Sequence, residues 1–345
     1  MSKQINVVVI GFGFGHQLDY GRELAEHGDT KLVGVGERPG FMDEIAIQKG
    51  RDFAAKYGVE YYADYREMLK VVNAQAASVA VEPEFNVEIA RNLARHGISM
   101  MCEKPIGDSL KQVDELGKVL EETGVKFTFD APMTIFSNSF RPAIEQVQAG
   151  AIGEARVGYF QYLASNGPEY VLSPERCRQV TRAELANFGP YGILAFLKMF
   201  NAPIKSVFAR KQAAFYEQYR ENNLDDLSLL SLKFEGGGIG TMLIGRTTTK
   251  GLPSTDLRMQ VIGSQGVVNI EDGLGYGMEL YVDNAHRRLR FGASVGKLFV
   301  DDFVSAVRDD RQPMITFQDA RTVMAFLDAA YESADSGQEV SLKVF

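Results

Sequence analysis

The stretch VVVIGFGFGHQ begins with apolar residues and continues with three glycines at alternate positions. Glycine permits the tight turn that joins a strand to a helix, and it lets the backbone come close to a pyrophosphate. The helix that follows offers unpaired N–H groups and the positive end of its dipole. A glycine-rich turn that binds no ligand would look similar, so a second feature has to support the assignment. The predicted dinucleotide-binding loop consists of Gly11, Phe12, Gly13, Phe14 and Gly15.

An acidic residue supplies that second feature. Glu37 ends the next strand-like segment, 26 positions after Gly11, and the dinucleotide fingerprint has an acid about 20 residues past its loop. Its carboxylate would accept a hydrogen bond from the adenosine ribose 2′-OH and repel a 2′-phosphate, which favours NAD over NADP. The adjacent Arg38 could stack on adenine or meet a phosphate, and this keeps NADP open.

His16 stands where the fingerprint has its third glycine. At the start of a helix, its ring N–H could reach a phosphate of the cofactor or the substrate. Alternatively, the ring packs between the helix and the strand, at the contact where the fingerprint has a glycine. The sequence does not decide between these two interpretations.

A lysine follows a second apolar strand in the stretch ISMMCEKPIG, which contains Glu103, Lys104 and Pro105. Ligands of open α/β sheets bind at the carboxyl ends of the strands. Lys104 there could donate a proton to a substrate oxygen, hold a hydroxyl for hydride transfer, or form a surface ion pair with Glu103. Action as a general base would require that burial or a nearby cation lowers the pKa of the lysine.

These residues can form one site only if the fold brings the ends of their strands together. The first 130 residues have the sequence pattern of such a fold. Strand-like and helix-like segments alternate, as in a doubly wound parallel sheet of the Rossmann type. We predict an α/β dinucleotide-binding domain over residues 1–130. Its strands are expected at 5–10, 30–37, 76–81, 98–105 and 125–132, and its helices at 21–28, 44–58, 65–72, 84–97 and 109–124.

Residues 131–345 have a different pattern and are predicted to form an α+β domain with a large, mostly antiparallel open sheet. Glycine-rich stretches at 234–240 and 263–266 predict hairpin turns. Two amphipathic helices close the chain, and we allow for the last one packing back on the first domain. The clearest strands are expected at 155–164, 228–234, 239–248 and 257–263, and the helices at 139–150, 298–310 and 317–335.

The composition excludes several classes of partner. The net charge is −8 and basic residues form no long block, which argues against nucleic acid or an anionic membrane. Two cysteines do not suggest a disulfide framework. We see no signal peptide and no apolar stretch long enough to span a bilayer, so the expected location is the cytoplasm. The four histidines are scattered along the chain, and no metal site is expected.

Taken together, GFGFG, GVGER, MCEKPIG, AGAIGEARV and the C-terminal helical segment resemble the glucose-fructose oxidoreductase, inositol dehydrogenase and MocA (Gfo/Idh/MocA) family. The resemblance covers nearly the whole chain. It implies a Rossmann domain followed by an α/β domain whose open sheet frames the substrate cleft and often an oligomer interface. It also implies oxidation or reduction of sugars, polyols and their derivatives with NAD or NADP. Lys104 matches the active-site lysine of the family.

The resemblance assigns two residues of the second domain. Many members carry D-x-G-x-H, with histidine as the acid/base residue, where this chain has ANFGPYGILAF. Asn187 replaces the acid and Tyr191 the histidine, similar to the branch that uses tyrosine for proton transfer. A lysine ammonium and an oxidised nicotinamide would both stabilise a phenolate. Tyr191 is therefore expected to be catalytic and Asn187 to bind substrate, although Tyr191 could also be a buried structural aromatic.

A further difference follows the strand AASVAV. The family usually has a small hydroxyl residue before proline, with a histidine soon after, where this chain reads VEPEFNVE. Glu82 and Pro83 are expected at the cofactor, and Glu82 could bind ribose or substrate hydroxyls. These differences bear on the substrate more than on the cofactor.

We therefore predict an NAD(P)-dependent oxidoreductase that acts on CH–OH groups of a neutral sugar, polyol or similar compound. Two alternatives stay open: a glycoside hydrolase or lyase that uses bound NAD transiently, and a cofactor-binding regulator without catalysis. A homodimer or homotetramer formed through the second-domain sheet is expected. The residues predicted to bind the cofactor are Gly11, Phe12, Gly13, Phe14, Gly15, His16, Glu37, Arg38, Glu82, Pro83, Glu103 and Lys104.

Overall fold

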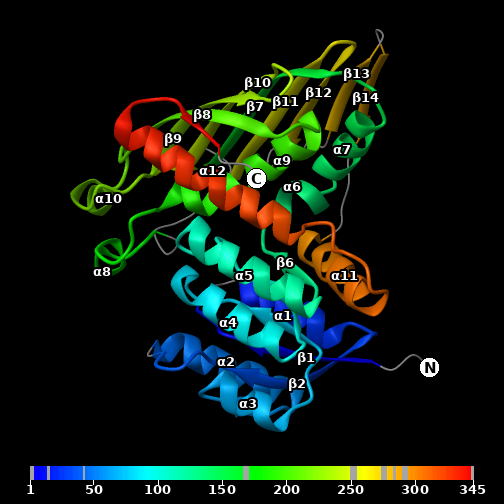
Figure 1. Ribbon diagram of the computed structural model, residues 1–345, viewed down its shortest axis with the longest axis vertical. Coiled ribbons are helices and arrows are strands. Elements are labelled where there is room, and N and C mark those ends of the chain that lie inside the picture. The colour runs from blue at the N-terminus through cyan, green and yellow to red at the C-terminus, as the bar shows by residue number, and fades with distance from the viewer. Residues whose placement is uncertain are drawn as a thin grey trace. The chain divides into compact units, whose positions relative to one another are not determined.

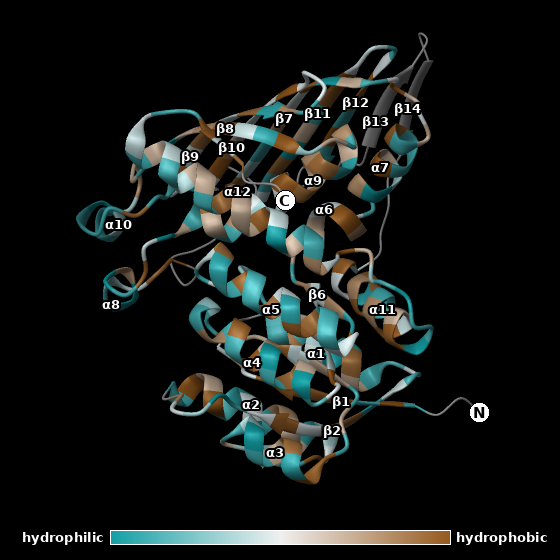
Figure 2. Cartoon of the chain, in the orientation of Figure 1, coloured by the Kyte–Doolittle hydropathy of each residue, from teal (hydrophilic) through white to brown (hydrophobic). Residues whose placement is uncertain are grey.

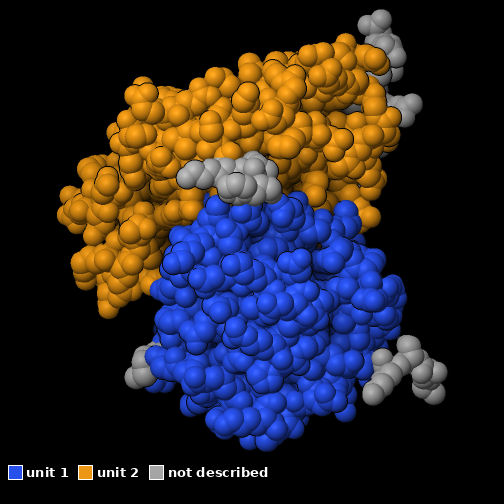
Figure 3. Space-filling view, in the orientation of Figure 1, with its two compact units in different colours: residues 1–132, 294–324 blue, residues 133–293, 325–345 orange. Residues whose placement is uncertain are grey.

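The computed structural model divides the chain into two compact units, coloured separately in Figure 3. Unit 1 comprises Met1–Pro132 and Ser294–Met324, and unit 2 comprises Met133–Ala293 and Ala325–Phe345. The structure describes residues 4–13, 16–41, 43–165, 171–248, 255–272, 278–282, 285–289 and 294–342.

The described part of unit 1 contains a six-stranded parallel sheet in the order β3-β2-β1-β4-β5-β6. Figure 1 labels β1, β2 and β6 of this sheet, in which β1 lies between β2 and β4. Its residues are almost entirely buried because helices cover both faces of such a sheet. The strands are β1 (Ile5–Ile10), β2 (Thr30–Gly36), β3 (Tyr61–Tyr62), β4 (Ala76–Val79), β5 (Ser99–Cys102) and β6 (Phe127–Phe129).

Local sequence signals begin and end the helices of unit 1. Asp43 accepts hydrogen bonds from two backbone N–H groups at the start of α2, and Gly58, at φ +67°, ends that helix. The Ser109 hydroxyl accepts from the Gln112 N–H at the start of α5. The helices are α1 (His16–Glu26), α2 (Glu44–Tyr57), α3 (Tyr65–Val71), α4 (Pro83–Arg95), α5 (Leu110–Thr123) and α11 (Val295–Arg308).

The second predicted domain, 131–345, is not continuous in the structure. Its residues 294–324 group with unit 1, because α11 buries its apolar face there. The rings of Tyr20 and Phe299 meet edge to face with centroids 5.5 Å apart, and Arg308 forms a 2.6 Å ion pair with Asp29. The boundary between the units falls inside α12 (Phe317–Ser336).

Among the described residues, unit 2 contains a nine-stranded sheet in the order β14-β13-β12-β11-β7-β10-β9-β8-β15. β7 and β10 are parallel, and the other neighbours are antiparallel, so the predicted fold class is confirmed. The predicted hairpin turns join β9 to β10 and β11 to β12. The strands are β7 (Ala155–Ala164), β8 (Ile204–Gln212), β9 (Leu227–Phe234), β10 (Ile239–Arg246), β11 (Thr255–Gly263), β12 (Gly266–Asp272), β13 (Met278–Val282), β14 (Ala285–Leu289) and β15 (Val340–Ser341).

One face of this sheet packs against α9 (Glu184–Phe200), a mostly buried helix that is largely brown in Figure 2. Phe196 of α9 lies where a Cβ on Gly158 or Gly240 would clash, so these strand glycines make room for its ring. None of the described helices combines the length and apolar character needed to cross a membrane. The other helices of unit 2 are α6 (Met133–Phe136), α7 (Phe140–Gln148), α8 (Pro174–Cys177) and α10 (Glu217–Glu221).

Candidate functional site

Candidate ligand-binding groups follow five of the parallel strands in unit 1 at one edge of the sheet. The glycine loop follows β1, and single acidic residues follow β2, β4 and β6. The Glu103–Lys104 pair follows β5. Carboxyl ends of parallel strands are where open α/β sheets bind ligands. The fold therefore gathers the predicted residues of the first domain at one edge.

The first two loop glycines are required for different reasons. Gly11 has φ +81°, and a Cβ there would lie 2.6 Å from the Ala80 carbonyl oxygen, so the turn itself demands glycine. Gly13 is exposed, and among the described residues an added Cβ would approach only Phe41, at 3.4 Å. Close approach of a ligand explains that glycine better than protein packing does.

The structure describes only one of the other three loop residues predicted to bind the cofactor. The ring of Phe12 is buried and packs against Phe53 with centroids 5.3 Å apart, so its side chain points into the core. Only the backbone of Phe12 is left for a ligand at this loop. Phe14 and Gly15, predicted to bind the cofactor, lie outside the described residues.

Glu37 presents a buried carboxylate at the end of β2. One oxygen, Oε1, accepts a 2.9 Å hydrogen bond from the Arg38 N–H. The other, Oε2, is buried and has no hydrogen-bond partner among the described residues. Burial raises the pKa of Glu37 to about 7, against the hydrogen bonds from backbone N–H groups. An unsatisfied buried acceptor is costly, and a ribose hydroxyl is the kind of donor that would satisfy it.

Arg38 and Glu82 form an ion pair with each other. The Arg38 Nε and Nη2 atoms donate to the two carboxylate oxygens of Glu82, each at 2.8 Å. The guanidinium carbon also lies 4.1 Å from the ring centroid of Phe85 and 4.9 Å from that of Phe41. Pro83 is the first residue of α4. Arg38 and Glu82 were predicted as separate ligand-binding groups, and this contact between them was not predicted.

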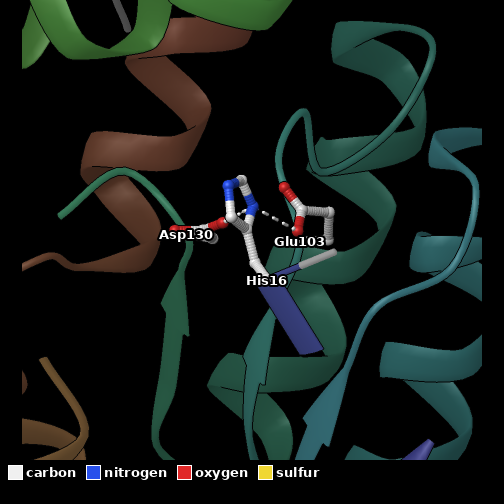
Figure 4. Close-up of side chains that lie close together, drawn as sticks. All are labelled: His16, Glu103 and Asp130. Carbon is white, nitrogen blue, oxygen red and sulfur yellow. Dashed lines mark hydrogen bonds and ion pairs between the residues drawn. The ribbon is translucent and has the colours of Figure 1, made fainter. Parts of the chain in front are cut away.

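His16 lies between two buried carboxylates, as Figure 4 shows. Its Nδ1 atom is 2.8 Å from Asp130 Oδ2 and 3.1 Å from Glu103 Oε2. The Tyr20 hydroxyl donates to Asp130 Oδ1 at 2.6 Å. The His16 side chain is 49% exposed, whereas both carboxylates are almost fully buried. His16 thus joins the start of α1 to the ends of β5 and β6.

The charges of these groups depend on each other. The Asp130 carboxylate, helped by Glu103, raises the pKa of His16 to about 10, although burial opposes this. Burial would raise the pKa of Asp130, but the charges of His16 and Lys104 prevail and lower it to about 2. Burial and the Asp130 charge raise the pKa of Glu103. At neutral pH, His16 is therefore an imidazolium beside an ionised Asp130.

The same three side chains could also coordinate a cation. Their ligand atoms lie within 4.8 Å of one another, although the ion pairs already account for the arrangement. The absence of a metal site stays a prediction. This grouping was not predicted, because His16, Glu103 and Asp130 are far apart along the chain.

Lys104 is buried at the end of β5. Its Nζ atom is 3.9 Å from Glu103 Oε1, and its backbone N–H donates to the same oxygen at 3.2 Å. The Asn86 side chain fixes the turn by donating to the carbonyl oxygens of Glu103 and Pro105, at 3.0 and 3.2 Å. The Lys104–Pro105 peptide bond is cis. A solvated surface ion pair, one of the open alternatives, does not fit this burial.

Unit 2 carries the two residues assigned by resemblance, one helical turn apart on α9. Tyr191 is 4% exposed, and its ring stacks on Tyr162 with centroids 5.5 Å apart. The Asn187 amide donates to Glu184 Oε2 at 3.1 Å. Glu184 also forms a buried ion pair with Arg246, at 2.8 Å. Tyr191 is thus held firmly, which both the catalytic and the structural interpretation allow.

Sequence reasoning missed Asp130 and Tyr20 altogether. A signal for Asp130 was present, since it follows the apolar run FTF as Glu37 and Glu103 follow their strands. The recurrence of an acid after several parallel strands is the pattern that would have identified it. Tyr20 carries no comparable signal, because a tyrosine on an amphipathic helix is ordinary.

Models of known protein families match both parts of the chain. Residues 5–131 match the model described as "Oxidoreductase family, NAD-binding Rossmann fold", and residues 140–269 match the "GFO/IDH/MocA C-terminal domain". Together these matches span well over half of the sequence.

Individual proteins agree with these models. The trans-1,2-dihydrobenzene-1,2-diol dehydrogenase of Sus scrofa is 24% identical over 73% of this chain and 72% of its own. The myo-inositol 2-dehydrogenase of Thermotoga maritima is 21% identical over 88% of this chain and 90% of its own. An oxidoreductase from Agrobacterium radiobacter, solved with NAD+, L-tartaric acid and magnesium, superposes with a TM-score of 0.85 at 15% identity, over 98% of each chain.

Proposed function

The chain belongs to the Gfo/Idh/MocA family of NAD-binding oxidoreductases, and from this premise we propose that it interconverts a hydroxyl and a carbonyl on a neutral sugar, polyol or related compound. The observation that carries the proposal is the buried Lys104 held by Glu103 at the end of β5. Relatives named for inositol and for a dihydrodiol support a hydroxyl-bearing ring as the substrate.

The residues present fit an NAD molecule. The backbone around Gly11 and Gly13 would face the pyrophosphate, because Gly13 leaves space there that protein packing does not use. Glu37 would hold the adenosine ribose through its unsatisfied Oε2. His16, half exposed at the start of α1 with its Nδ1 atom held by Asp130 and Glu103, would offer the N–H of its other ring nitrogen to a phosphate. Under this proposal His16 would serve the cofactor.

Bound NAD supplies the acceptor or donor of a hydride. The chain contributes the groups that hold the substrate and move its proton. Lys104 would orient and polarise the substrate oxygen with its ammonium. Tyr191 would accept the hydroxyl proton as its phenolate on oxidation and donate it from its hydroxyl on reduction, and Asn187 would hydrogen-bond a neighbouring hydroxyl. Lys104, Asn187 and Tyr191 can all hydrogen-bond substrate hydroxyls, which suits an uncharged substrate.

We also propose that the open face of the nine-stranded sheet joins two copies of the chain. Ile239 on β10, Val157 on β7 and Ile262 on β11 lie in register and are 52%, 41% and 38% exposed. Leu229 on β9 and Tyr159 on β7 are 54% and 39% exposed. Large apolar side chains exposed on one sheet, three of them in register, are typical of an interaction site.

One experiment tests the function. The purified chain is mixed with NAD or NADP and a panel of sugars and polyols, and the absorbance of the reduced cofactor is followed. With the best substrate, Lys104→Ala and Tyr191→Phe should each lower turnover about a hundredfold or more, the usual weight of a proton-transfer group. Lys118→Ala, at a lysine on α5, serves as the control and should retain turnover.

Near-wild-type turnover in either variant would remove that residue from the mechanism. Cofactor that stays bound through purification, with no turnover of added NAD, would instead point to transient redox chemistry without net oxidation. Binding of cofactor with no reaction on any substrate of the panel would favour a regulator.

A further inference from the structure

The ion pair between Arg38 and Glu82 lies at the strand ends that flank the glycine loop. Arg38 follows Glu37 at the end of β2, and Glu82 comes shortly after β4. β2 and β4 are the two neighbours of β1. The pair therefore links both sides of the strand whose end carries the dinucleotide loop.

Each nitrogen of the Arg38 guanidinium already donates one hydrogen bond. Nε and Nη2 donate to the two oxygens of Glu82 at 2.8 Å each, and Nη1 donates to the Pro39 carbonyl oxygen at 3.3 Å. The side chains of the pair are only 14% and 20% exposed. A bidentate guanidinium–carboxylate pair of this kind is strong and geometrically specific.

Glu82 has no other role that the structure shows. It occupies the position before the first turn of α4, yet its side chain makes no capping hydrogen bond to that helix. Ser, Thr, Asp and Asn are the residues that cap well there. Its carboxylate is directed to Arg38, which is the cation nearest in sequence to the ribose-binding Glu37.

We propose that Glu82 determines cofactor selectivity: it binds the guanidinium of Arg38 and thereby withholds it from the 2′-phosphate of NADP. Arginine is the residue that accommodates a 2′-phosphate at this position of a dinucleotide fold. With Glu82 in place, that phosphate meets the Glu37 carboxylate and an arginine whose charge is already neutralised. The proposal rests on the proposed function, since it assumes that the adenosine ribose lies at Glu37.

The test compares dissociation constants for NADH and NADPH, measured by the fluorescence of the reduced nicotinamide on the full chain. Glu82→Gln keeps the shape of the side chain and removes its charge. The Kd ratio of NADPH to NADH should fall about tenfold or more relative to wild type, as expected when one charge-assisted hydrogen bond becomes available. Glu88→Gln removes the same charge from an exposed position on α4 and should leave the ratio unchanged.

A second variant distinguishes two causes of a gain in NADPH affinity: the release of Arg38, and the loss of repulsion between the Glu82 carboxylate and the 2′-phosphate. In the Glu82→Gln, Arg38→Met double variant, the gain in NADPH affinity should disappear if Arg38 provides it. A gain that survives in the double variant would overturn the release of Arg38 as its cause. Circular dichroism of each variant establishes that it is folded.

The outcomes also separate this proposal from the proposed function. If the wild-type chain binds neither cofactor, both fail. If it binds NADH and the ratio for Glu82→Gln equals those of wild type and Glu88→Gln, the oxidoreductase stands and the role of Glu82 is wrong. A wild type that prefers NADPH would likewise overturn it.

Discussion

At the scale of single residues, a buried cluster of acids needs a compensating cation. Glu103 and Asp130 are almost fully buried, and His16 is within 3.1 Å of both. A histidine whose folded pKa is raised above its unfolded value stabilises the protein fully below the unfolded pKa. That contribution is lost as the pH rises toward about 10. His16 therefore serves the fold as well as any ligand.

His16→Gln tests this charge compensation. It should lower the free energy of unfolding by about 1–3 kcal/mol at pH 7, less than for a fully buried pair because His16 is half exposed. The difference from wild type should narrow from pH 6.5 toward pH 10. Urea denaturation provides the measurement. Adding Asp130→Asn should recover part of the loss, and a double variant less stable than His16→Gln would contradict the explanation.

Glu37 gives a second prediction, on the pH dependence of NADH binding. Burial raises its pKa to about 7, so it gains a proton as the pH falls through that value and becomes a poorer acceptor for a ribose hydroxyl. Affinity for NADH should fall about tenfold between pH 8 and pH 6. Titrations across this range measure it. Glu37→Gln should flatten the profile, and an unchanged slope in that variant would show that another group titrates.

The sequence predicted the positions of some site residues but not their contacts. Apolar runs followed by acids or lysine predicted the strand ends where Glu37 and Lys104 lie. The contacts between side chains could not be predicted. Arg38 and Glu82, for example, are 44 positions apart, and only the order of strands in the sheet brings them together. The same holds for His16 and Asp130, which depend on where β1 and β6 end.

At the scale of elements, the glycine loop separates a folding requirement from a ligand requirement. Gly11→Ala introduces a Cβ at φ +81° and 2.6 Å from the Ala80 carbonyl oxygen. We expect a loss of about 2 kcal/mol or more in the free energy of unfolding. Among the described residues, the methyl group of Gly13→Ala approaches only Phe41, at 3.4 Å, and this variant should unfold near the wild-type urea concentration.

NADH affinity completes that comparison. Gly13→Ala should still weaken NADH binding about tenfold or more, because the new methyl group stands where the backbone would approach the pyrophosphate. Gly58→Ala, with nothing within 4 Å of the added Cβ but a φ of +67° at the end of α2, is a control for backbone strain outside the loop. Normal NADH binding by Gly13→Ala would remove this loop from the cofactor site.

Elements with clean periodicity were predictable, and those set by tertiary context were not. β7 begins and ends where its alternation predicts, at 155 and 164. α9 was not predicted as a helix, since Pro190 and two glycines interrupt it and its stability comes from packing under the sheet. β8 escaped prediction as well, because its polar residues weaken the apolar alternation.

At the scale of the whole molecule, each of the two compact units is built from two separate segments of the chain. α11 joins unit 1 although 161 residues of unit 2 precede it. Sequence periodicity predicted this helix but not its partner, because an amphipathic face does not specify what covers it. The same limitation applies to the exposed face of the sheet in unit 2, whose apolar residues stand in register across three strands.

That face leads to the last prediction, on assembly. If the open sheet joins two copies, Ile239→Glu puts a charge in the middle of an apolar contact and should convert a dimer or tetramer to smaller species. Sedimentation velocity at micromolar concentration measures this. Ile45→Glu, at a 73% exposed isoleucine on α2 of unit 1, is the matched control and should keep the wild-type assembly. A monomeric wild type would refute the interface, and so would an Ile239→Glu variant that sediments as wild type does. Disruption by Ile45→Glu alone would place the contact on unit 1 instead.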